Sequence, residues 1–123
     1  MKRDLDLMRD IMLRIEERCP GKRKTTAAAF ADLTDDLEKI GFHLYLLYDA
    51  GFIDAIPVKC TKLHYTDYFI YGLTFRGCDY LDSVRDASIW SSVKENLLRI
   101  GGNATMDVIA ELASSLLRDR LGI

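Results

Sequence analysis

Cysteine and histidine are scarce in this chain, which argues against a metal site. The 123 residues include three cysteines and two histidines. Cys19, Cys60 and Cys78 form no Cys-x-x-Cys pair, and an odd number cannot complete a disulfide framework. Structural zinc sites need four nitrogen or sulfur ligands at suitable spacing. We therefore expect no metal, no intrachain disulfide, and thiols that behave as small apolar side chains.

Long apolar runs are also missing. The longest, such as Leu44 to Tyr48, is far shorter than the roughly 20 residues that a membrane helix needs. The charged start, residues 1–6, lacks the apolar centre of a secretory signal peptide. The composition is 49% hydrophobic and 29% charged, as in ordinary globular proteins. These features predict one cytoplasmic domain with no membrane partner.

No combination of residues predicts an enzyme. Ser88, Ser91 and Ser92 lie at the start of an expected helix, where helix capping explains them. The sequence contains no nucleophile elbow, no phosphate-binding glycine loop and no metal-binding His-Glu motif. Active sites need clustered nucleophiles, bases and orienting groups. We therefore predict no catalytic residue and no cofactor.

Hydrophobic periodicity and turn signals predict the order of the elements. Helices are expected over 4–18, 32–40, 42–50, 74–86 and 88–100, with a last helix capped by Thr105. Strands are expected over 25–30, 52–58 and 68–73, the last two flanking a polar tip at 59–67. Gly41 is expected to turn the chain between two short helices, and Gly51 to end the second. This is the order of a winged helix-turn-helix followed by a helical hairpin.

The chain after the last expected strand is the most informative part of the sequence. Thr74 is a good N-cap, and Gly77 allows a neighbouring backbone to come close. Leu73, Gly77, Leu81 and Val84 fall on one helical face. Many winged-helix domains leave their wing in this way.

The predicted fold class is mostly α (α+β). A winged-helix-like core with a small β wing is expected over residues 1–86. A helical hairpin, residues 87–123, is expected to pack on that core as part of a single domain. Residues 20–34 are the least clearly patterned. The predicted core consists of Ile11, Ile15, Leu44, Leu47, Ile53, Leu73, Leu81, Trp90, Val93, Leu97, Ile109 and Leu112.

Several blocks of the sequence also carry a family resemblance. They are Met1–Ile11, Phe42–Leu44 with Leu47, Ala50–Ile53, Leu73–Thr74 with Gly77, Leu81–Asp82, Arg85–Asp86, Ile89–Trp90, Val93–Lys94, Gly101–Gly102 and Leu121–Ile123. Together they resemble a small bacterial and prophage family, the domain-of-unknown-function family 2513. The resemblance spans nearly the whole chain, and residues 20–34 depart from it most. It implies a winged-helix-like core and a phage or prophage setting, and it supplies no catalytic residues.

The net charge of −2 hides an uneven distribution. Residues 1–24 carry +3 and residues 59–78 carry +2, whereas residues 25–58 carry −5. The expected recognition helix, 42–50, has no Arg, Lys, Asn or Gln for reading bases. Since DNA affinity comes largely from neutralised phosphates, contacts would have to come from the basic turns. The predicted phosphate-binding residues are Lys22, Arg23, Lys24, Lys59, Lys62 and His64. Alternatively, these residues form ordinary solvated turns.

Protein binding is the competing hypothesis. The same helix is apolar on several sides and lies in an acidic zone, which suits a protein partner better than phosphate. Its predicted contact residues are His43, Tyr45, Leu46 and Asp49. The C-terminal hairpin offers a second surface, suited to a homodimer. Analogy of fold places a phage-associated, DNA-binding regulator narrowly first, and a phage-encoded modulator of a host protein second.

Overall fold

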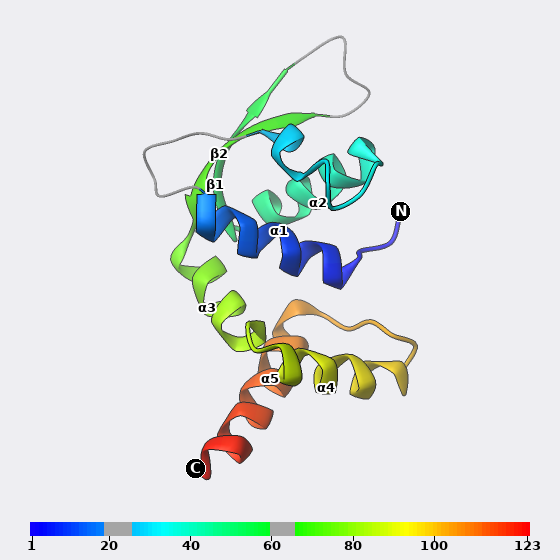
Figure 1. Cartoon of the computed structure of the whole chain (residues 1–123), viewed down its shortest axis with the longest axis vertical. Coiled ribbons are helices and arrows are strands. Elements are labelled where there is room, and N and C mark those ends of the chain that lie inside the picture. Colours follow the sequence, from blue (N-terminus) through cyan, green and yellow to red (C-terminus); the bar gives the residue numbers. More distant parts are fainter. Residues whose placement is uncertain (19–25, 60–65) are drawn as a thin grey trace. The chain divides into compact units, whose positions relative to one another are not determined.

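Helices and one small antiparallel sheet make up the fold (Figure 1). The computed structural model describes residues 1–18, 26–59 and 66–123. Within these ranges lie α1 (Leu5–Arg18), the 3₁₀ helix η1 (Ala27–Phe30), α2 (Leu37–Asp49), β1 (Ile53–Val58), β2 (Asp67–Leu73), α3 (Phe75–Val84), α4 (Ala87–Leu98) and α5 (Met106–Leu121). The predicted class, mostly helical α+β, is confirmed.

The chain divides into two compact units. Unit 1 is Met1–Cys78 and unit 2 is Asp79–Ile123. The division falls inside α3, before the boundary predicted after residue 86. Unit 1 therefore contains α1 to β2 with the start of α3, and unit 2 contains the rest of α3 with α4 and α5.

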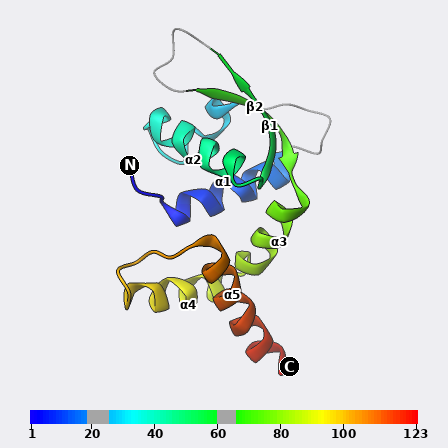
Figure 2. The same ribbon diagram turned by 180° about the vertical axis from the view of Figure 1, so that it is seen from behind.

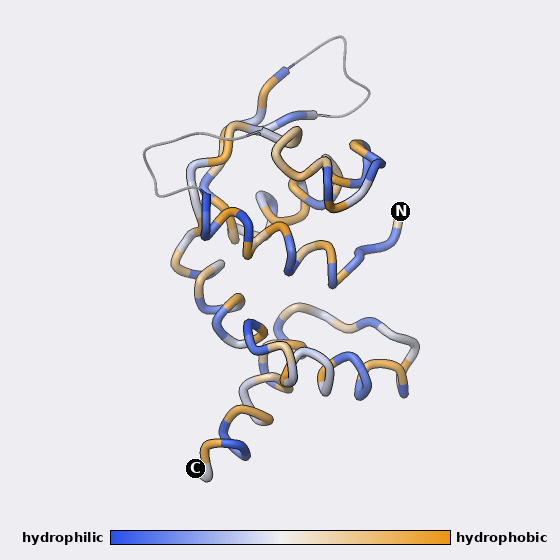
Figure 3. The backbone as a smooth tube through the Cα atoms, in the orientation of Figure 1, coloured by the Kyte–Doolittle hydropathy of each residue, from blue (hydrophilic) through white to orange (hydrophobic). Residues whose placement is uncertain are grey.

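Helix α1 forms as its periodicity predicts. Its apolar residues recur among charged ones along the helix (Figure 3), and Ile11, Met12 and Ile15 are fully buried. Asp4 begins the helix, because its Oδ1 accepts a hydrogen bond from the Leu7 backbone N–H at 3.0 Å. The expected helix over 4–18 is confirmed.

The strand expected over 25–30 is wrong. Residues 27–30 form η1, with Ala27 and Phe30 buried. An alanine-rich segment has little strand propensity, so tertiary contacts decide its conformation. Here the Ala27 backbone N–H donates to Asp67 Oδ1 at 3.0 Å, and this bond joins η1 to the start of β2.

The helix expected over 42–50 is present, but the separate helix over 32–40 and the turn at Gly41 are wrong. One continuous helix, α2, runs through Gly41, which is buried within it. Asp36 is its N-cap and accepts from the Lys39 backbone N–H at 3.2 Å. Glycine lowers helix stability by about 1 kcal/mol relative to alanine, which packing of the buried α2 face offsets. Gly51, with φ +76°, follows the helix as predicted.

Strands β1 and β2 pair antiparallel, as predicted for 52–58 and 68–73. The register runs from Ile53 opposite Leu73 to Val58 opposite Asp67, with an irregularity between Asp54 and Ala55. Figure 2 shows the pair lying beside α2, and α2 contacts both strands. Most of the predicted polar tip lies outside the described residues.

The exit from β2 into α3 contains the expected Thr74 cap and the expected close backbone approach at Gly77. Thr74 Oγ1 accepts from the Gly77 backbone N–H at 3.0 Å and so caps α3. The Thr74 backbone N–H donates to Phe52 O at 3.1 Å. A Cβ placed on Gly77 would lie 2.0 Å from that same Phe52 oxygen. Glycine is therefore required here by a close backbone approach.

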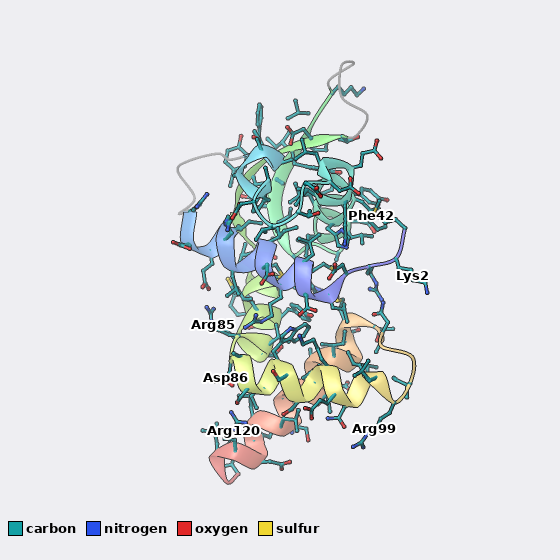
Figure 4. All side chains as sticks on the ribbon, turned by 45° about the vertical axis from the view of Figure 1, so that its right-hand side comes forward. Lys2, Phe42, Arg85, Asp86, Arg99 and Arg120 are labelled. Atoms are coloured by element: carbon teal, nitrogen blue, oxygen red, sulfur yellow. The ribbon has the colours of Figure 1, made fainter. Side chains whose placement is uncertain are left out.

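Unit 2 contains the predicted pair of helices. Asp86 caps α4 by accepting from the Ser88 and Ile89 backbone N–H groups at 3.0 and 2.9 Å. Arg120, near the end of α5, binds the same Asp86 carboxylate at 3.3 Å (Figure 4). Thr105 caps α5, as expected, by accepting from the Val108 N–H at 3.3 Å. The two helices contact one another, and α5 is steeply inclined to α4 (Figure 1).

Burial follows the predicted core closely. Leu73 and Leu112 are only half-buried. The others are buried: Ile11, Ile15, Leu44, Leu47, Ile53, Leu81, Trp90, Val93, Leu97 and Ile109.

Candidate functional site

The candidate site is the side of α2 that faces away from the core of unit 1. Ile40, Leu44 and Leu47 are fully buried on the opposite side of the helix. The residues that remain at the surface follow a helical line with spacing i, i+4, i+7 and i+11, which places them on one face. We call this the α2 face, and it consists of Glu38, Phe42, Tyr45 and Asp49, with Tyr48 beside them.

Aromatic side chains form the middle of the α2 face. Tyr45 is 48% exposed and Tyr48 is 39% exposed. Tyr48 also packs on Tyr68 of β2, with ring centroids 5.4 Å apart and ring planes inclined by 43°. Burial raises the pKa of Tyr68, and the nearby Tyr45, Tyr48 and Asp49 add to that rise. Tyr68 of β2 therefore lies against Tyr48 of the α2 face.

Carboxylates flank this aromatic centre. Glu38 and Asp49 are both exposed, one near each end of α2, and Asp35 and Asp36 precede the helix. Lys39 is the single basic residue of α2, and its Nζ binds Asp4 Oδ2 at 2.9 Å. The face is therefore acidic at its edges and aromatic at its centre.

His43 does not belong to this face, so its predicted role in docking is wrong. The side chain has no exposed surface. Its Nδ1 donates to Lys39 O at 2.7 Å, while its Nε2 accepts from the Asp4 backbone N–H at 2.8 Å. Burial lowers the pKa of His43, which favours the neutral ring that these two bonds require. His43 joins the start of α1 to α2, and has no ring nitrogen left for a ligand.

The other three residues predicted for protein binding have exposed surface. Tyr45 and Asp49 are exposed, and Leu46 is half-buried. The sequence reasoning missed Glu38, Phe42 and Tyr48. The helix break assumed at Gly41 separated Glu38 from the others. Phe42 and Tyr48 lay within the helix expected over 42–50, and the regular spacing along it could have revealed them.

The predicted phosphate-binding residues are largely beyond what the structure describes. Lys59 is exposed just after β1. The remaining ones lie outside the described residues: Lys22, Arg23, Lys24, Lys62 and His64. Of these six residues, the structure therefore describes Lys59 alone.

The described parts of the chain contain neither a cluster of metal ligands nor a membrane-spanning helix. No group of three or more His, Cys, Asp or Glu side chains there could hold a metal ion. Cys78 is exposed with a free thiol, whereas Cys19 and Cys60 lie outside the described residues. Among the described helices, none combines the length and apolar character needed to cross a bilayer.

Comparison with known proteins supports the resemblance seen in the sequence. The family described as "Hypothetical protein (DUF2513)" matches residues 2–103, which include every element from α1 to α4. The chain belongs to the DUF2513 family. An uncharacterized protein of Haemophilus influenzae is similar to this DUF2513 chain, with 28% identity over 121 residues, 98% of this chain and 99% of that protein. No solved structure matches this chain. The whole α2 face lies within the part that the family matches.

Proposed function

We propose that unit 1 is a winged-helix-like module that binds a protein partner through the α2 face. The order α1, η1, α2 and a β-hairpin that exits through a capped helix supports the winged-helix assignment. In this arrangement η1 takes the place of the first helix of a helix-turn-helix, and α2 takes the place of the recognition helix. The proposed role is binding without catalysis.

The composition of the α2 face carries the proposal. A helix that reads the major groove presents Arg, Lys, Asn or Gln to base edges. At the same place α2 presents tyrosines between Glu38 and Asp49, and its one lysine is paired with Asp4. Carboxylates repel phosphate, while exposed tyrosines are typical anchors of protein interfaces.

The same face indicates what the partner looks like. Glu38 and Asp49 are separated by eleven helical steps, which corresponds to about 16 Å along α2. A complementary surface carries basic side chains at about this separation around an apolar pocket for Tyr45 or Tyr48. Opposite charges at the rim would mainly speed association and make it sensitive to salt.

A DNA-binding regulator is the second candidate, favoured by the winged-helix analogy alone. The exposed Lys59, next to the hairpin tip, is in a suitable place for a phosphate contact. Such binding would use the hairpin and avoid α2. The phage setting implied by the resemblance fits both candidates, since phage proteins act on host DNA and on host proteins.

A pull-down with quantitative mass spectrometry, followed by calorimetry with the purified partner, tests the proposal. Tyr45→Ala should weaken the complex by about 1–4 kcal/mol, since exposed aromatic anchors contribute this much at interfaces. Charge reversal at Glu38 and Asp49 should slow association. Phe75→Ala is the matched control, because Phe75 is an exposed aromatic residue of the same unit outside the α2 face.

Two outcomes would overturn the proposal. Recovery of the same proteins in equal yield by the wild type and Tyr45→Ala would remove the α2 face from consideration. Salt-sensitive binding to labelled duplex DNA, lost when Lys24, Lys59 and Lys62 are all changed to Glu but unchanged in Tyr45→Ala, would establish the DNA alternative instead.

A further inference from the structure

Helix α5 has a second apolar face that α4 leaves accessible. Only Ile109 and Ala113 of α5 are buried. Ala110, Ser114 and Leu117 are half-buried, and Leu121 is 70% exposed. These four residues have the spacing i, i+4, i+7 and i+11, so they form one face along the whole helix, which we call the α5 face. In Figures 1 and 2 the second half of α5 extends away from α4.

We propose that the α5 face binds the same face of a second copy of the chain, with the two α5 helices antiparallel. The first half of the face holds the small residues Ala110 and Ser114, and the second half holds Leu117 and Leu121. When two such helices pair antiparallel, the half of each helix that carries the leucines lies opposite the half of the other that carries the small residues. Leu117 of the second copy then fits between Ala110 and Ser114 of the first, in a close and complementary contact.

Charge complementarity favours a second copy of the chain as the partner of the α5 face, and an antiparallel arrangement of the two helices. Glu111 and Arg118 are both exposed and lie on the same edge of the α5 face, two helical turns apart. In an antiparallel pair centred between Ser114 and Ser115, Glu111 of each copy lies opposite Arg118 of the other. In a symmetric parallel pair this edge of each helix would instead face the other edge of its partner, and Glu111 and Arg118 would not meet across the contact. The two helix dipoles also oppose one another favourably in the antiparallel pair.

The size of the contact sets its expected strength. Helix α5 has 16 residues and is therefore about 24 Å long. One pair of helices of this length buries less surface than the roughly 1,200–2,000 Å² of a stable interface. The dimer should therefore be weak, with a dissociation constant in the micromolar range, and weaker still at high salt because its charge pairs are exposed.

Sedimentation velocity over a range of protein concentrations, from about 1 to about 300 μM, tests this pairing. The wild type should shift from monomer to dimer across that range. Glu111→Arg alone and Arg118→Glu alone should each weaken the dimer about tenfold or more, because each places like charges opposite one another twice. The double swap, with both substitutions in one chain, should restore dimerisation. Arg99→Glu is the matched control, since Arg99 is exposed but lies at the end of α4.

Each result decides the matter. A wild type that stays monomeric at the highest concentration overturns the proposal, and so does a dimer that both single reversals leave unchanged. A dimer weakened by both single reversals but not restored by the double swap excludes the antiparallel register. Since the α5 face shares no residue with the α2 face, failure here would not affect the proposed binding of a protein partner.

Discussion

The backbone oxygen of Phe52 occupies the place where a side chain on Gly77 would begin. A Cβ on Gly77 would lie 2.0 Å from Phe52 O and 2.9 Å from Phe52 C. The same oxygen accepts the Thr74 N–H at 3.1 Å, so the start of α3 is held against the turn that follows α2. Because both atoms belong to backbone, neither can move aside as a flexible side chain would.

Gly77→Ala tests this contact by the sign of its effect. In an unobstructed helix, alanine would stabilise the protein by up to about 1 kcal/mol relative to glycine. The clash with Phe52 O should reverse that gain and destabilise unit 1 by about 2–4 kcal/mol. Urea denaturation measures the change. Cys78→Ala, at the next and exposed position, should change the free energy of unfolding by less than about 0.5 kcal/mol. A more stable Gly77→Ala protein would show that α3 does not approach Phe52 this closely.

His43 should make stability depend on pH below neutrality. Burial lowers its pKa from the ordinary 6.5, with Asp4 and Lys39 as the charged groups facing it. The unfolded chain therefore binds a proton more readily than the folded chain. Stability from the neutral ring is complete above about pH 6.5 and is lost as the pH falls through the lower folded pKa. Protonation would also place two N–H groups together, at Nε2 and at the Asp4 backbone.

Urea unfolding at several pH values between 5 and 8 checks this expectation. His43→Leu should lower stability by about 1–3 kcal/mol at pH 8, since the Asp4 N–H loses its acceptor, and should flatten the pH dependence. His64→Gln is the control, because His64 is the other histidine of the sequence. A pH dependence of stability that persists in His43→Leu and disappears in His64→Gln would contradict this prediction. It would show that His64, and not His43, is the titrating residue.

Leu47 should be among the costliest positions to truncate in unit 1. It is fully buried on the inner side of α2. Leu47→Ala should therefore lower the free energy of unfolding by about 2–5 kcal/mol, through lost burial and the cavity left behind. Leu37→Ala removes a leucine that is 37% exposed from the same helix and should have a much smaller effect. An unchanged denaturation midpoint for Leu47→Ala would contradict the placement of α2 against the core.

Local signals allowed several elements to be predicted correctly. Helix α1, the β1–β2 hairpin and the Thr74 cap each depend on residues close together in the chain. These signals are the apolar stripe of a helix, the residue pattern of a strand and a hydroxyl three residues before the N–H that it caps. All of them act at short range, so a single sequence reveals them. Even the close approach at Gly77 was expected, although the identity of the approaching residue, Phe52, was not.

The errors came where contacts distant in sequence outweigh local preference. Gly41 favours a turn locally, but packing keeps it inside α2. Ala27 to Phe30 has no strong preference, and the bond from Ala27 to Asp67 places η1 there. His43 looks like any polar residue on a helix until Asp4, 39 residues earlier, is found to donate to it.

For the candidate site, the sequence by itself determined the chemistry and only the tertiary structure decided the geometry. The acidic charge of residues 25–58 and the presence of Tyr45 and Asp49 could be read directly from the sequence, since composition needs no coordinates. Which side of the helix faces solvent depends on which side the rest of unit 1 covers. That burial excluded His43. The continuous helix brought Glu38 into line with Phe42, Tyr45 and Asp49, because it keeps a constant angular step between residues.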